Sequence, residues 1–404
     1  MSLKRCLGQW APGVRVARTG IGIGLVLGIL GTLVAQWGTT GAKARVGLKR
    51  ESFHAAIDIV LDQYVEPVDA NAMMGRGLKH MVSGLDPHSY YLTAAERGRA
   101  SLQGQHGTTT GLLVRLHPAR AGHGADLEVA AVLPGSAAER EGLRPGDRIL
   151  ELDGRRSEFF LSQMEAELLL SGREGDRVEL LVQRGHAMAS EEVSLTVHKA
   201  RNSDLVAGVV IERQDRRVAH MKIRSFRSGT GRWFVRTLEA LLNQRGTGPV
   251  EAVILDLRGN PGGEVAEALI VADYFIAEGI LTRTRGRGGR ILREERAHRA
   301  GTNTEIPLVV VQDRRSASAS ELLAVALQEH GRAMILGERS YGKGTVQQVT
   351  GLDDGSLLTL TIARYFSPKD RLIDGNGVSP DVAIDDSFDP IPVAADLALA
   401  TGLR

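Results

Sequence analysis

The pattern of apolar and polar positions changes three times along the chain and divides it into four stretches. No charged residue occurs from Thr19 to Ala42. Between Glu51 and Ala100 apolar residues recur at helical spacing, which predicts a small helical element interrupted by a turn at 85–89. From about residue 104 the apolar runs are short and separated by glycine and proline turns, as in β-strands. Beyond residue 200 strand-like and helix-like stretches alternate, which predicts a layered α/β domain with helices packed on a sheet.

These patterns also predict individual elements. In the third stretch we expect one helix at 157–170 and strands at 112–116, 127–132, 148–152 and 178–183. In the fourth we expect helices near 230–244, from about 264 and at 320–329, and strands at 219–223, 252–257 and 308–311. The chain then has five parts: a signal or anchor segment at 1–44, an N-terminal helical element at 45–103, a domain of strands at 104–200, an α/β core at 201–390 and a C-terminal tail at 391–404.

The uncharged stretch from Thr19 to Ala42 is long enough to span a lipid bilayer. Basic residues precede it, and Ala42-Lys43-Ala44 has the small-x-small form of a signal cleavage site. An uncleaved anchor and a cleaved signal therefore both remain open. The positive-inside rule does not fix the orientation, because basic residues flank both ends of the stretch.

Charge and cysteine content exclude several classes of function. The 50 Lys and Arg residues are balanced by 48 Asp and Glu residues, so the formal net charge of +2 indicates no nucleic-acid partner. The single cysteine, Cys6, precedes the uncharged stretch, so the rest of the chain has no disulfide and no thiolate metal site. The histidines lack metal-ligand spacing. Residues 337–343 match the opening of a phosphate-binding loop, but Gly344 stands where Ser or Thr should bind magnesium. We expect no metal and no cofactor.

Four segments carry a family resemblance: Ser83-Gly-Leu-Asp-Pro-His-Ser-Tyr-Tyr-Leu92, Leu255-Asp-Leu-Arg-Gly-Asn-Pro-Gly-Gly263, Ser316-Ala-Ser-Ala-Ser-Glu-Leu-Leu323 and Gly337-Glu-Arg-Ser-Tyr-Gly-Lys-Gly-Thr-Val-Gln347. In this order they resemble the carboxyl-terminal processing proteases, and the resemblance runs from about residue 53 to residue 385. It implies that Ser318 is the catalytic nucleophile, that Lys343 is the general base and that Gln347 assists the lysine.

The residues themselves are consistent with these roles. Ser318 lies where a predicted strand ends and an apolar helix begins, so free N–H groups of the helix would lie beside an oxyanion formed there. Serine alone is a poor nucleophile, but a lysine in a desolvated pocket can be neutral and accept its proton. Lys343 and Gln347 would share one face of an extended strand, which would allow a hydrogen bond between them. The alternatives are a helix-capping serine and a solvated loop lysine.

The turn Asn260-Pro-Gly-Gly263 follows a strongly apolar strand and precedes a helix, so it exposes backbone amides. The family resemblance implies that this turn helps to form the oxyanion hole. We assign the N–H group of Gly262 or Gly263 to that role, together with that of Ala319. A plain strand-to-helix turn is the alternative, because glycine allows such backbone shapes anywhere.

A further run, from Val132 to Asp147 with the apolar positions and turn that follow it, resembles a PDZ domain of the kind found in bacterial proteases. The resemblance implies a carboxylate-binding loop at 110–113 and an edge strand at Val114, to which a peptide end adds as another strand. Met164 and Leu168 on the predicted helix also suit a plain core. The candidate peptide-binding residues are Gly111, Leu112, Leu113, Met164 and Leu168.

Two features depart from the family pattern. Gly-Leu-Leu-Val replaces the usual Gly-Leu-Gly-Phe of the PDZ loop, which leaves the shape of the peptide pocket open. Asp313-Arg314-Arg315 replaces the Asn- and Gly-rich approach to the nucleophile, and these two cations could alter the substrate groove or favour acidic substrates.

Together these features predict an α/β and α+β multidomain serine endopeptidase with a helical element, a PDZ domain and a crotonase- or ClpP-like layered core. The resemblance implies action on the periplasmic side of a bacterial inner membrane, anchored or secreted, on proteins or peptides with accessible C-terminal tails. A homo-oligomer or an adaptor is compatible with this reading. The main alternative is a catalytically silent PDZ scaffold, against which Ser318, Lys343 and Gln347 together argue. A crotonase-like enzyme acting on acyl thioesters is a second alternative, but it has no evident use for a PDZ domain.

Overall fold

The computed structural model describes residues 49–97, 108–117, 124–133, 136–170, 172–185, 189–199, 205–244, 248–299, 301–385 and 388–401 of the 404-residue chain. It divides into two compact units, residues 1–70 and 71–404. The predicted membrane segment at 19–42 lies outside the described residues. Within the described part of the chain, no helix is both long enough and apolar enough to cross a membrane.

The predicted helical element contains two helices, α2 (Arg50–Gln63) and α3 (Ala70–Ser83). No residue of α2 is buried. After α3 the chain makes the predicted turn at 85–89 and enters the short strand β1 (Tyr90–Leu92). This strand pairs with β18 (Leu357–Phe366), so a segment of the N-terminal element extends a sheet formed by residues near the C-terminus.

The predicted PDZ domain is an antiparallel sheet in the order β3-β4-β5-β7-β8, with β6 paired to β5. A short pair, β2 and β9, joins the points where the chain enters and leaves the domain. The four predicted strands are confirmed, but the helix predicted at 157–170 is divided in two, because Ser162 is extended and caps the second helix by accepting a hydrogen bond from the N–H of Glu165. The elements are β2 (Thr108–Thr109), β3 (Leu112–His117), β4 (Asp126–Val132), α5 (Ala137–Arg140), β5 (Arg148–Leu152), β6 (Arg155–Arg156), η1 (Ser157–Phe159), α6 (Gln163–Leu169), β7 (Arg177–Gln183), β8 (Ser190–Thr196) and β9 (His198–Lys199).

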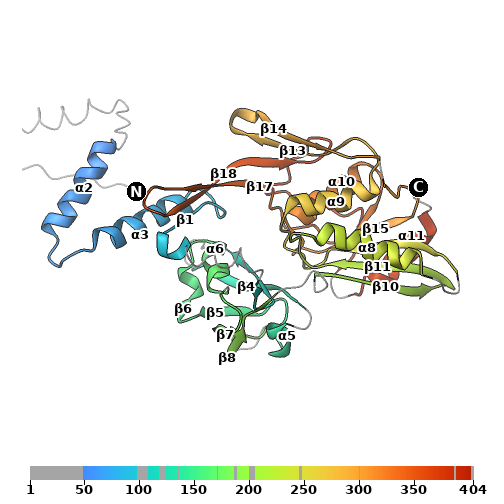
Figure 1. Cartoon of the computed structure of the whole chain (residues 1–404), viewed down its shortest axis with the longest axis horizontal. Helices are drawn as coiled ribbons and strands as arrows, with labels where there is room; N and C mark the ends of the chain where they lie inside the picture. The colour runs from blue at the N-terminus through green and yellow to red at the C-terminus, as the bar shows by residue number, and fades with distance from the viewer. Residues whose placement is uncertain are drawn as a thin grey trace, which may run out of the picture. The chain divides into compact units, whose positions relative to one another are not determined.

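The core contains a six-stranded sheet in the order β10-β11-β12-β15-β16-β19, in which only the β10–β11 pair is antiparallel. Figure 1 shows α8, α9 and α10 side by side over this sheet. The bounds are β10 (Val206–Arg213), β11 (Arg216–Ile223), α8 (Thr230–Leu242), β12 (Val250–Asp256), α9 (Val265–Phe275), β15 (Leu308–Gln312), α10 (Ala319–Glu329), β16 (Met334–Gly337), β19 (Val382–Ala383) and α11 (Ile391–Thr401).

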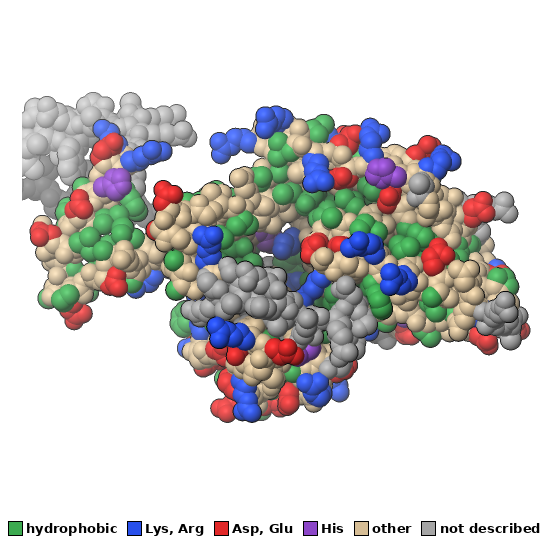
Figure 2. Space-filling model, in the orientation of Figure 1, with side chains coloured by type: hydrophobic (Ala, Val, Ile, Leu, Met, Phe, Trp, Pro, Cys, Tyr) green, Lys and Arg blue, Asp and Glu red, His purple; other side chains and the backbone are tan. Residues whose placement is uncertain are grey.

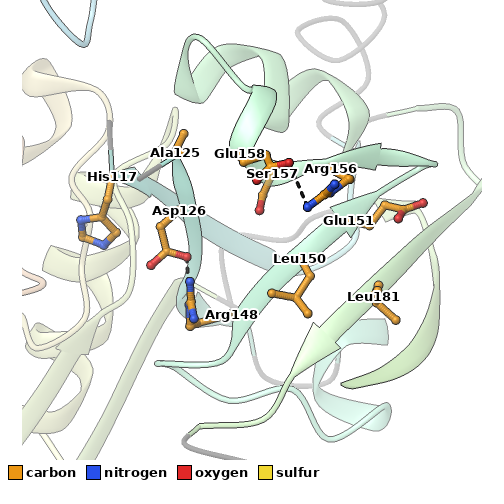
Figure 3. Close-up of a pocket in the computed structure, with 11 residues that line it drawn as sticks. His117, Ala125, Asp126, Arg148, Leu150, Glu151, Arg156, Ser157, Glu158 and Leu181 are labelled. Atoms are coloured by element: carbon orange, nitrogen blue, oxygen red, sulfur yellow. Dashed lines mark hydrogen bonds and ion pairs between the residues drawn. The ribbon is translucent and has the colours of Figure 1, made fainter. Parts of the chain in front are cut away.

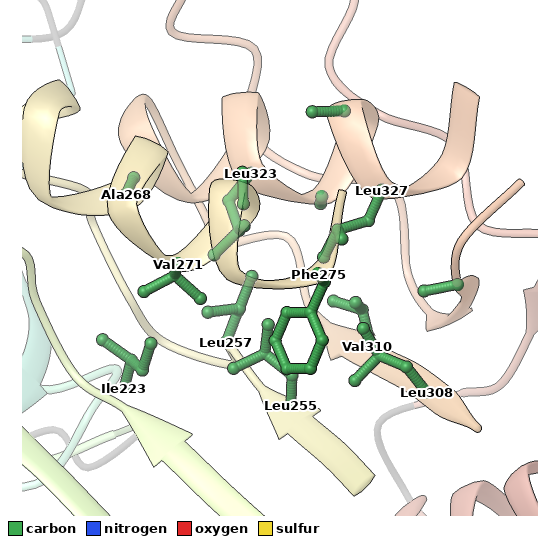
Figure 4. Close-up of a cluster of buried hydrophobic side chains, with 14 of the residues drawn as sticks. Ile223, Leu255, Leu257, Ala268, Val271, Phe275, Leu308, Val310, Leu323 and Leu327 are labelled. Carbon is green, nitrogen blue, oxygen red and sulfur yellow. The ribbon is translucent and has the colours of Figure 1, made fainter. Parts of the chain in front are cut away.

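The central strands are buried on both faces, which explains their almost continuous apolar sequences. Side chains alternate along each strand, so Leu255 and Val310 face α9 and α10, while Ile254 and Val309 face the opposite layer. Figure 4 shows Phe275 of α9 packed over the first of these faces. The opposite face is covered by α11, whose Ala394, Ala395 and Ala398 are buried. The segment predicted as a C-terminal tail at 391–404 therefore contributes a helix to the core, because its alanine-rich face fits closely against the sheet.

A second sheet of the core was mostly missed by the sequence analysis. It is five-stranded and antiparallel, in the order β1-β18-β13-β14 with β17 also paired to β18. Of this sheet, the sequence predicts only the extended strand that carries Gln347. Its remaining elements are β13 (Ile280–Gly286), η2 (Arg287–Gly289), β14 (Ile291–Arg296) and β17 (Thr345–Gly351).

Candidate active site

Loops that follow the carboxyl ends of four neighbouring parallel strands meet at one pocket with a volume of about 440 Å³. The loops after β11, β12, β15 and β16 contribute residues 225–227, residues 261–264, Ser318 and Lys343 respectively. Such a position is the usual ligand site of open parallel sheets. The opposite wall comes from the predicted PDZ domain, and Gln347 completes the lining; the PDZ residues are Leu112, Leu113, Val114, Gln163, Glu167 and Leu170. In the space-filling view a hollow lies where this domain meets the core, and basic side chains show at its edge (Figure 2).

Ser318 occupies a strained turn immediately before α10. Its backbone has φ 57° and ψ −118°, a conformation that costs a non-glycine residue of order 1–3 kcal/mol. The residue is half-buried, and it caps a helix whose first nine residues are all buried. Strain of this kind persists only where surrounding contacts impose it, and it presents the serine side chain at the pocket beside the helix N-terminus.

The contacts that impose this turn come from the buried carboxylate of Glu321. Its Oε2 accepts hydrogen bonds from the backbone N–H groups of Ser318 at 2.7 Å and Lys343 at 2.8 Å. Its Oε1 accepts from the hydroxyl of Ser340 at 2.5 Å and the N–H of Gly342 at 2.6 Å. Burial raises the pKa of Glu321, while these four hydrogen bonds favour its charged form. One side chain thus fixes the serine turn to the loop that carries the lysine.

Lys343 is half-buried and immediately precedes β17. Burial lowers the pKa of Lys343; Glu167 raises it, Arg115 lowers it further and Glu321 raises it. A lowered lysine pKa is what a general base near neutral pH requires. His88, from the turn before β1, faces the same lysine: burial, followed by the charge of Lys343, lowers the pKa of His88 to about 4, so this imidazole is neutral at pH 7.

Gln347 lines the pocket but forms no hydrogen bond with Lys343 in this structure, which differs from the expectation of a direct bond. A bulge between Val346 and Gln347 breaks the simple strand alternation on which that expectation rested. Instead, its Nε2 donates to Thr345 Oγ1 at 2.8 Å and to Thr361 Oγ1 at 3.3 Å.

Asp86 holds the threonine that orients Gln347. The hydroxyl of Thr361 donates to Asp86 Oδ1 at 3.0 Å, and its N–H donates to the hydroxyl of Ser89 at 3.0 Å. Burial would raise the pKa of Asp86, but hydrogen bonds from Ser89, His88 and Thr361 hold it below its usual value. The turn at 85–89 therefore supports the candidate site from a distant part of the sequence.

The turn at 260–263 carries two N–H groups predicted for the oxyanion hole, those of Gly262 and Gly263, and they differ in their hydrogen bonding. The N–H of Gly262 donates to Asn260 Oδ1 at 2.8 Å and is already engaged. The N–H groups of Gly263 and Ala319 have no acceptor among the described residues. At Gly263 the φ of 134° and the approach of the Phe226 carbonyl, 1.9 Å from where a Cβ would lie, require glycine. The N–H groups of Gly263 and Ala319 are therefore the pair that could donate hydrogen bonds to an oxyanion.

The loop before this turn is fixed by Asp256 at the end of β12. Its carboxylate accepts from Arg258 Nε at 2.9 Å and Nη2 at 2.8 Å, and from Lys222 at 3.2 Å. Burial opposes ionisation, but the hydrogen bonds from His220 and Arg258 and the charges of Lys222 and Arg258 hold the pKa of Asp256 well below its usual range.

The two cations predicted to shape the groove lie elsewhere. Arg315 is paired with Asp313, its Nε 3.0 Å from Oδ2, and Arg314 is exposed with its Nη1 4.0 Å from a Glu338 carboxylate oxygen. Neither lines the pocket that holds Ser318. The arginine that does line it is Arg227, which the sequence analysis missed.

Of the predicted peptide-binding residues, Leu112 and Leu113 line this pocket, whereas Gly111, Met164 and Leu168 do not. Helix α6 presents Gln163, Glu167 and Leu170 to it instead. Strand β3 is at the edge of its sheet, as predicted for Val114. Gly111 has φ 83°, and a Cβ there would lie 2.0 Å from that of Ser136, so the loop before β3 requires glycine.

A larger cavity of about 700 Å³ lies on another face of the same domain. Figure 3 shows two ion pairs among its side chains, Asp126 with Arg148 and Arg156 with Glu158. It contains no nucleophile with a neighbouring base, so size does not make it the candidate site. His330 follows the last residue of α10, and its Nε2 lies 2.8 Å from the Ile280 carbonyl oxygen. Among the described residues, no group of three or more His, Cys, Asp or Glu side chains is placed to hold a metal ion.

Comparison with known proteins agrees with this geometry. The family model for Peptidase family S41 matches residues 217–384, and that for the PDZ domain matches residues 128–184. Carboxyl-terminal-processing peptidase 3 of Arabidopsis thaliana, a chloroplastic protein, is 32% identical over 377 residues, which cover 87% of this chain and 68% of that protein. The chain belongs to the carboxyl-terminal processing peptidases. The family resemblance predicted from the sequence is thereby confirmed.

Two further relatives extend the comparison. Carboxyl-terminal-processing peptidase 2 of Arabidopsis thaliana is 33% identical over 332 residues, covering 80% of this chain but 62% of that protein, so the chain spans less than two thirds of this relative. The solved structure of the photosystem II D1 C-terminal processing protease superposes with a TM-score of 0.68 at 27% identity, covering 87% of this chain and 92% of that one. The family consists of serine-type peptidases, and a mixed α/β fold with a PDZ domain is shared along most of the chain.

Several residues of the site were not assigned from the sequence of this chain. Glu321 had a usable signal, since Ser followed three residues later by Glu is the form of a capping box. Asp86 and His88 lay in a quoted motif but had no visible partner. No sequence pattern marks Glu167 or Arg227 as site residues. Glu167 lies on α6 and Arg227 follows β11, and these two elements meet only in the folded chain.

Replacing Glu321 should reveal the structural role of its carboxylate. Glu321→Ala leaves four buried donors without an acceptor, so we expect the free energy of unfolding to fall by roughly 2–5 kcal/mol. Glu321→Gln keeps the shape of the side chain and one acceptor oxygen, so its free energy of unfolding should fall by less. Chemical denaturation of both variants measures this, with the half-buried Glu338→Gln as control. Equal stability of Glu321→Ala and the native chain would contradict the role of the carboxylate.

Proposed function

We propose that this chain is a serine endopeptidase that cuts extracytoplasmic proteins and recognises their C-terminal tails through its PDZ domain. The observation that carries the proposal is the pocket itself. It brings together a serine on a strained turn at a helix N-terminus and a lysine whose pKa is lowered by burial. These are the two groups that a Ser–Lys mechanism requires. The N-terminal segment at 19–42 would deliver the protein to, or hold it at, the membrane.

In the proposed reaction, Ser318 Oγ attacks the carbonyl carbon of the scissile peptide bond while neutral Lys343 takes the hydroxyl proton. The N–H groups of Gly263 and Ala319 donate to the resulting oxyanion. The tetrahedral intermediate then collapses, Lys343 gives its proton to the leaving amine, and an acyl-enzyme remains on Ser318. Water repeats the sequence, with Lys343 as base, and releases the acid product.

Gln347 would act on the lysine once it is charged. Its Nε2 is held by Thr345 and Thr361, which leaves Oε1 to accept a hydrogen bond from the Lys343 ammonium. Because the position of Thr361 depends on Asp86, the turn before β1 would contribute to this orientation without touching the substrate.

The PDZ domain would present the tail to the same pocket. Strand β3 has a free edge, and its residues Leu112, Leu113 and Val114 line the pocket with Ser318. A tail that adds to this edge as a further strand would therefore lead the substrate chain toward the nucleophile.

The first prediction concerns the Ser–Lys pair. Ser318→Ala and Lys343→Ala should each reduce cleavage of an unstructured protein by at least about a thousandfold, and the double variant should be no worse, because the two groups act as one unit. Initial rates and circular dichroism of the purified full chain measure activity and fold. Lys369→Ala, an exposed lysine outside the pocket, is the matched control.

Appreciable cleavage by Lys343→Ala at neutral pH would overturn the assignment of the base. Absence of cleavage by the native chain, with every peptide tried, would instead favour the silent PDZ scaffold.

The second prediction is a pH dependence. Only neutral Lys343 accepts the proton, so kcat/KM should rise with pH through the lysine pKa, which lies below its ordinary value. Since Glu167 raises that pKa, Glu167→Gln should move the rising limb to lower pH. A pH–rate profile of both proteins tests this, with Glu338→Gln as control. A limb that moves to higher pH, or does not move, would show that Glu167 does not act on the base.

The third prediction concerns tail capture. Leu113→Glu places a negative charge where a terminal carboxylate would bind, so the preference for a free over an amidated C-terminus should be lost while internal cleavage persists. The ratio of kcat/KM for the two peptides is the measurement. Leu181→Glu, on the far cavity of the same domain (Figure 3), is the matched control. An unchanged ratio in Leu113→Glu would remove β3 from tail recognition.

A further inference from the structure

Arg227 is held at the wall of the catalytic pocket by the backbone on both sides of it. It follows β11, and the preceding residue, Phe226, donates to the Gly262 carbonyl at 2.9 Å and accepts from the N–H of Glu264 at 2.8 Å. Arg227 itself donates its N–H to Thr230 Oγ1 at 3.0 Å. These bonds place the arginine beside the turn that carries the Gly263 amide, and its side chain lines the pocket with Ser318 and Lys343.

The guanidinium of Arg227 differs from its neighbours in having no bonded acceptor. Arg258 is bonded to Asp256, Arg315 to Asp313, and Arg115 to the carbonyl of Arg315. For Arg227, no side-chain hydrogen bond or ion pair within 4.0 Å is formed with any described residue, although the side chain is half-buried. Burial lowers the pKa of Arg227, and the only charge that raises it is that of Glu167. A partly buried guanidinium without an acceptor from the protein is able to bind an anion from outside.

Glu167 indicates which anion fits. It lies on α6 of the PDZ domain, lines the same pocket, and receives a hydrogen bond from Gln163 Nε2 at 2.6 Å. Its carboxylate acts electrostatically on both Arg227 and Lys343. The PDZ domain thus already supplies a carboxylate to the field of these two core cations. A substrate carboxylate bound at Arg227 would have the same sign of charge as Glu167 and would likewise stabilise the charged guanidinium.

The remaining charges favour a monoanion. The pocket lining contains two basic side chains, Arg227 and Lys343, and two acidic ones, Glu167 and the exposed Glu264. When Lys343 is neutral and acts as base, Arg227 is the remaining cation of that lining. A planar carboxylate can accept two hydrogen bonds from one guanidinium, whereas a dianion would carry a second charge toward Glu167.

We propose that Arg227 is a specificity-determining residue that binds a carboxylate of the substrate beside the scissile bond. The proposal rests on the proposed peptidase function and names a feature of its substrates. The carboxylate comes either from an acidic side chain close to the cleavage point or from the terminus of a short substrate tail.

The test compares peptides that differ by one group. One pair carries Glu or Gln next to the cleavage point with an amidated terminus, and a second pair carries Gln with a free or amidated terminus. For the native chain, kcat/KM should be higher for the carboxylate-bearing member of at least one pair by roughly ten- to a hundredfold, the value of one hydrogen bond to a charged group. Arg227→Gln should abolish that ratio by lowering kcat/KM mainly for the carboxylate-bearing peptide, while Arg227→Lys should keep part of the ratio.

Arg232→Gln provides the matched control, because it removes the same charge from an exposed position on α8 outside the pocket. A preference confined to the Glu and Gln pair assigns the carboxylate to a side chain, and one confined to the second pair assigns it to the terminus. To exclude a contribution from β3, the second pair is repeated in Leu113→Glu. A ratio of one in the native chain, or a ratio that survives in Arg227→Gln, overturns the proposal. No cleavage of any peptide by the native chain would mean that the peptidase function itself has failed.

Discussion

The carboxylate of Glu321 accepts four hydrogen bonds from two loops that follow different strands of the core sheet, and the geometry of the site depends on it. The serine turn follows β15 and the lysine loop follows β16. Each loop alone could take many shapes, because neither belongs to a regular element. A buried acceptor that both must satisfy leaves few shapes, since an unmet donor in this environment costs about 1–3 kcal/mol. The same bonds sustain the positive φ of Ser318, so the strain at Ser318 and the placement of the Lys343 loop have one physical cause.

A second set of contacts reaches the site from the start of the second unit. The turn at 85–89 bonds to Thr361 of β18, and Thr361 bonds to Gln347. Strand β1, which follows that turn, pairs with β18 in register with residues 357–359. The sheet pairing therefore brings Asp86 to Thr361 and His88 to the surroundings of Lys343. This arrangement explains why a motif far from the nucleophile in sequence belongs to the same site: its residues shape the surroundings of Lys343 and Gln347 and need not contact a substrate.

The extent to which the sequence predicted the structure follows from the range of each interaction. Buried strands such as β12 and β15 and the helix after Ser318 were predicted well, because apolar periodicity is local. Ser318 and Lys343 were predicted to share a site through motifs, and the structure places both in one pocket. The sheet of β13, β14, β17 and β18 was largely missed, because β14 and much of β17 are exposed and their sequences contain few apolar residues. Tertiary pairing also decided three details: the bulge that redirects Gln347, the bond that engages Gly262 and the burial of α11.

Charged side chains of the PDZ domain and of the core interact at the pocket. Lys343 and Arg227 belong to the core, whereas Glu167, which acts on both, belongs to the PDZ domain. A carboxylate near the lysine favours its charged form and so opposes its use as a base. The same carboxylate near the arginine compensates for a cation that lacks a bonded partner. An incoming substrate carboxylate bound at Arg227 would replace Glu167 as the negative charge that stabilises the guanidinium. The pKa of Lys343 would then depend on which carboxylates lie near the lysine. In the proposed reaction, substrate charge and the pKa of Lys343 would therefore be coupled through Glu167 of α6.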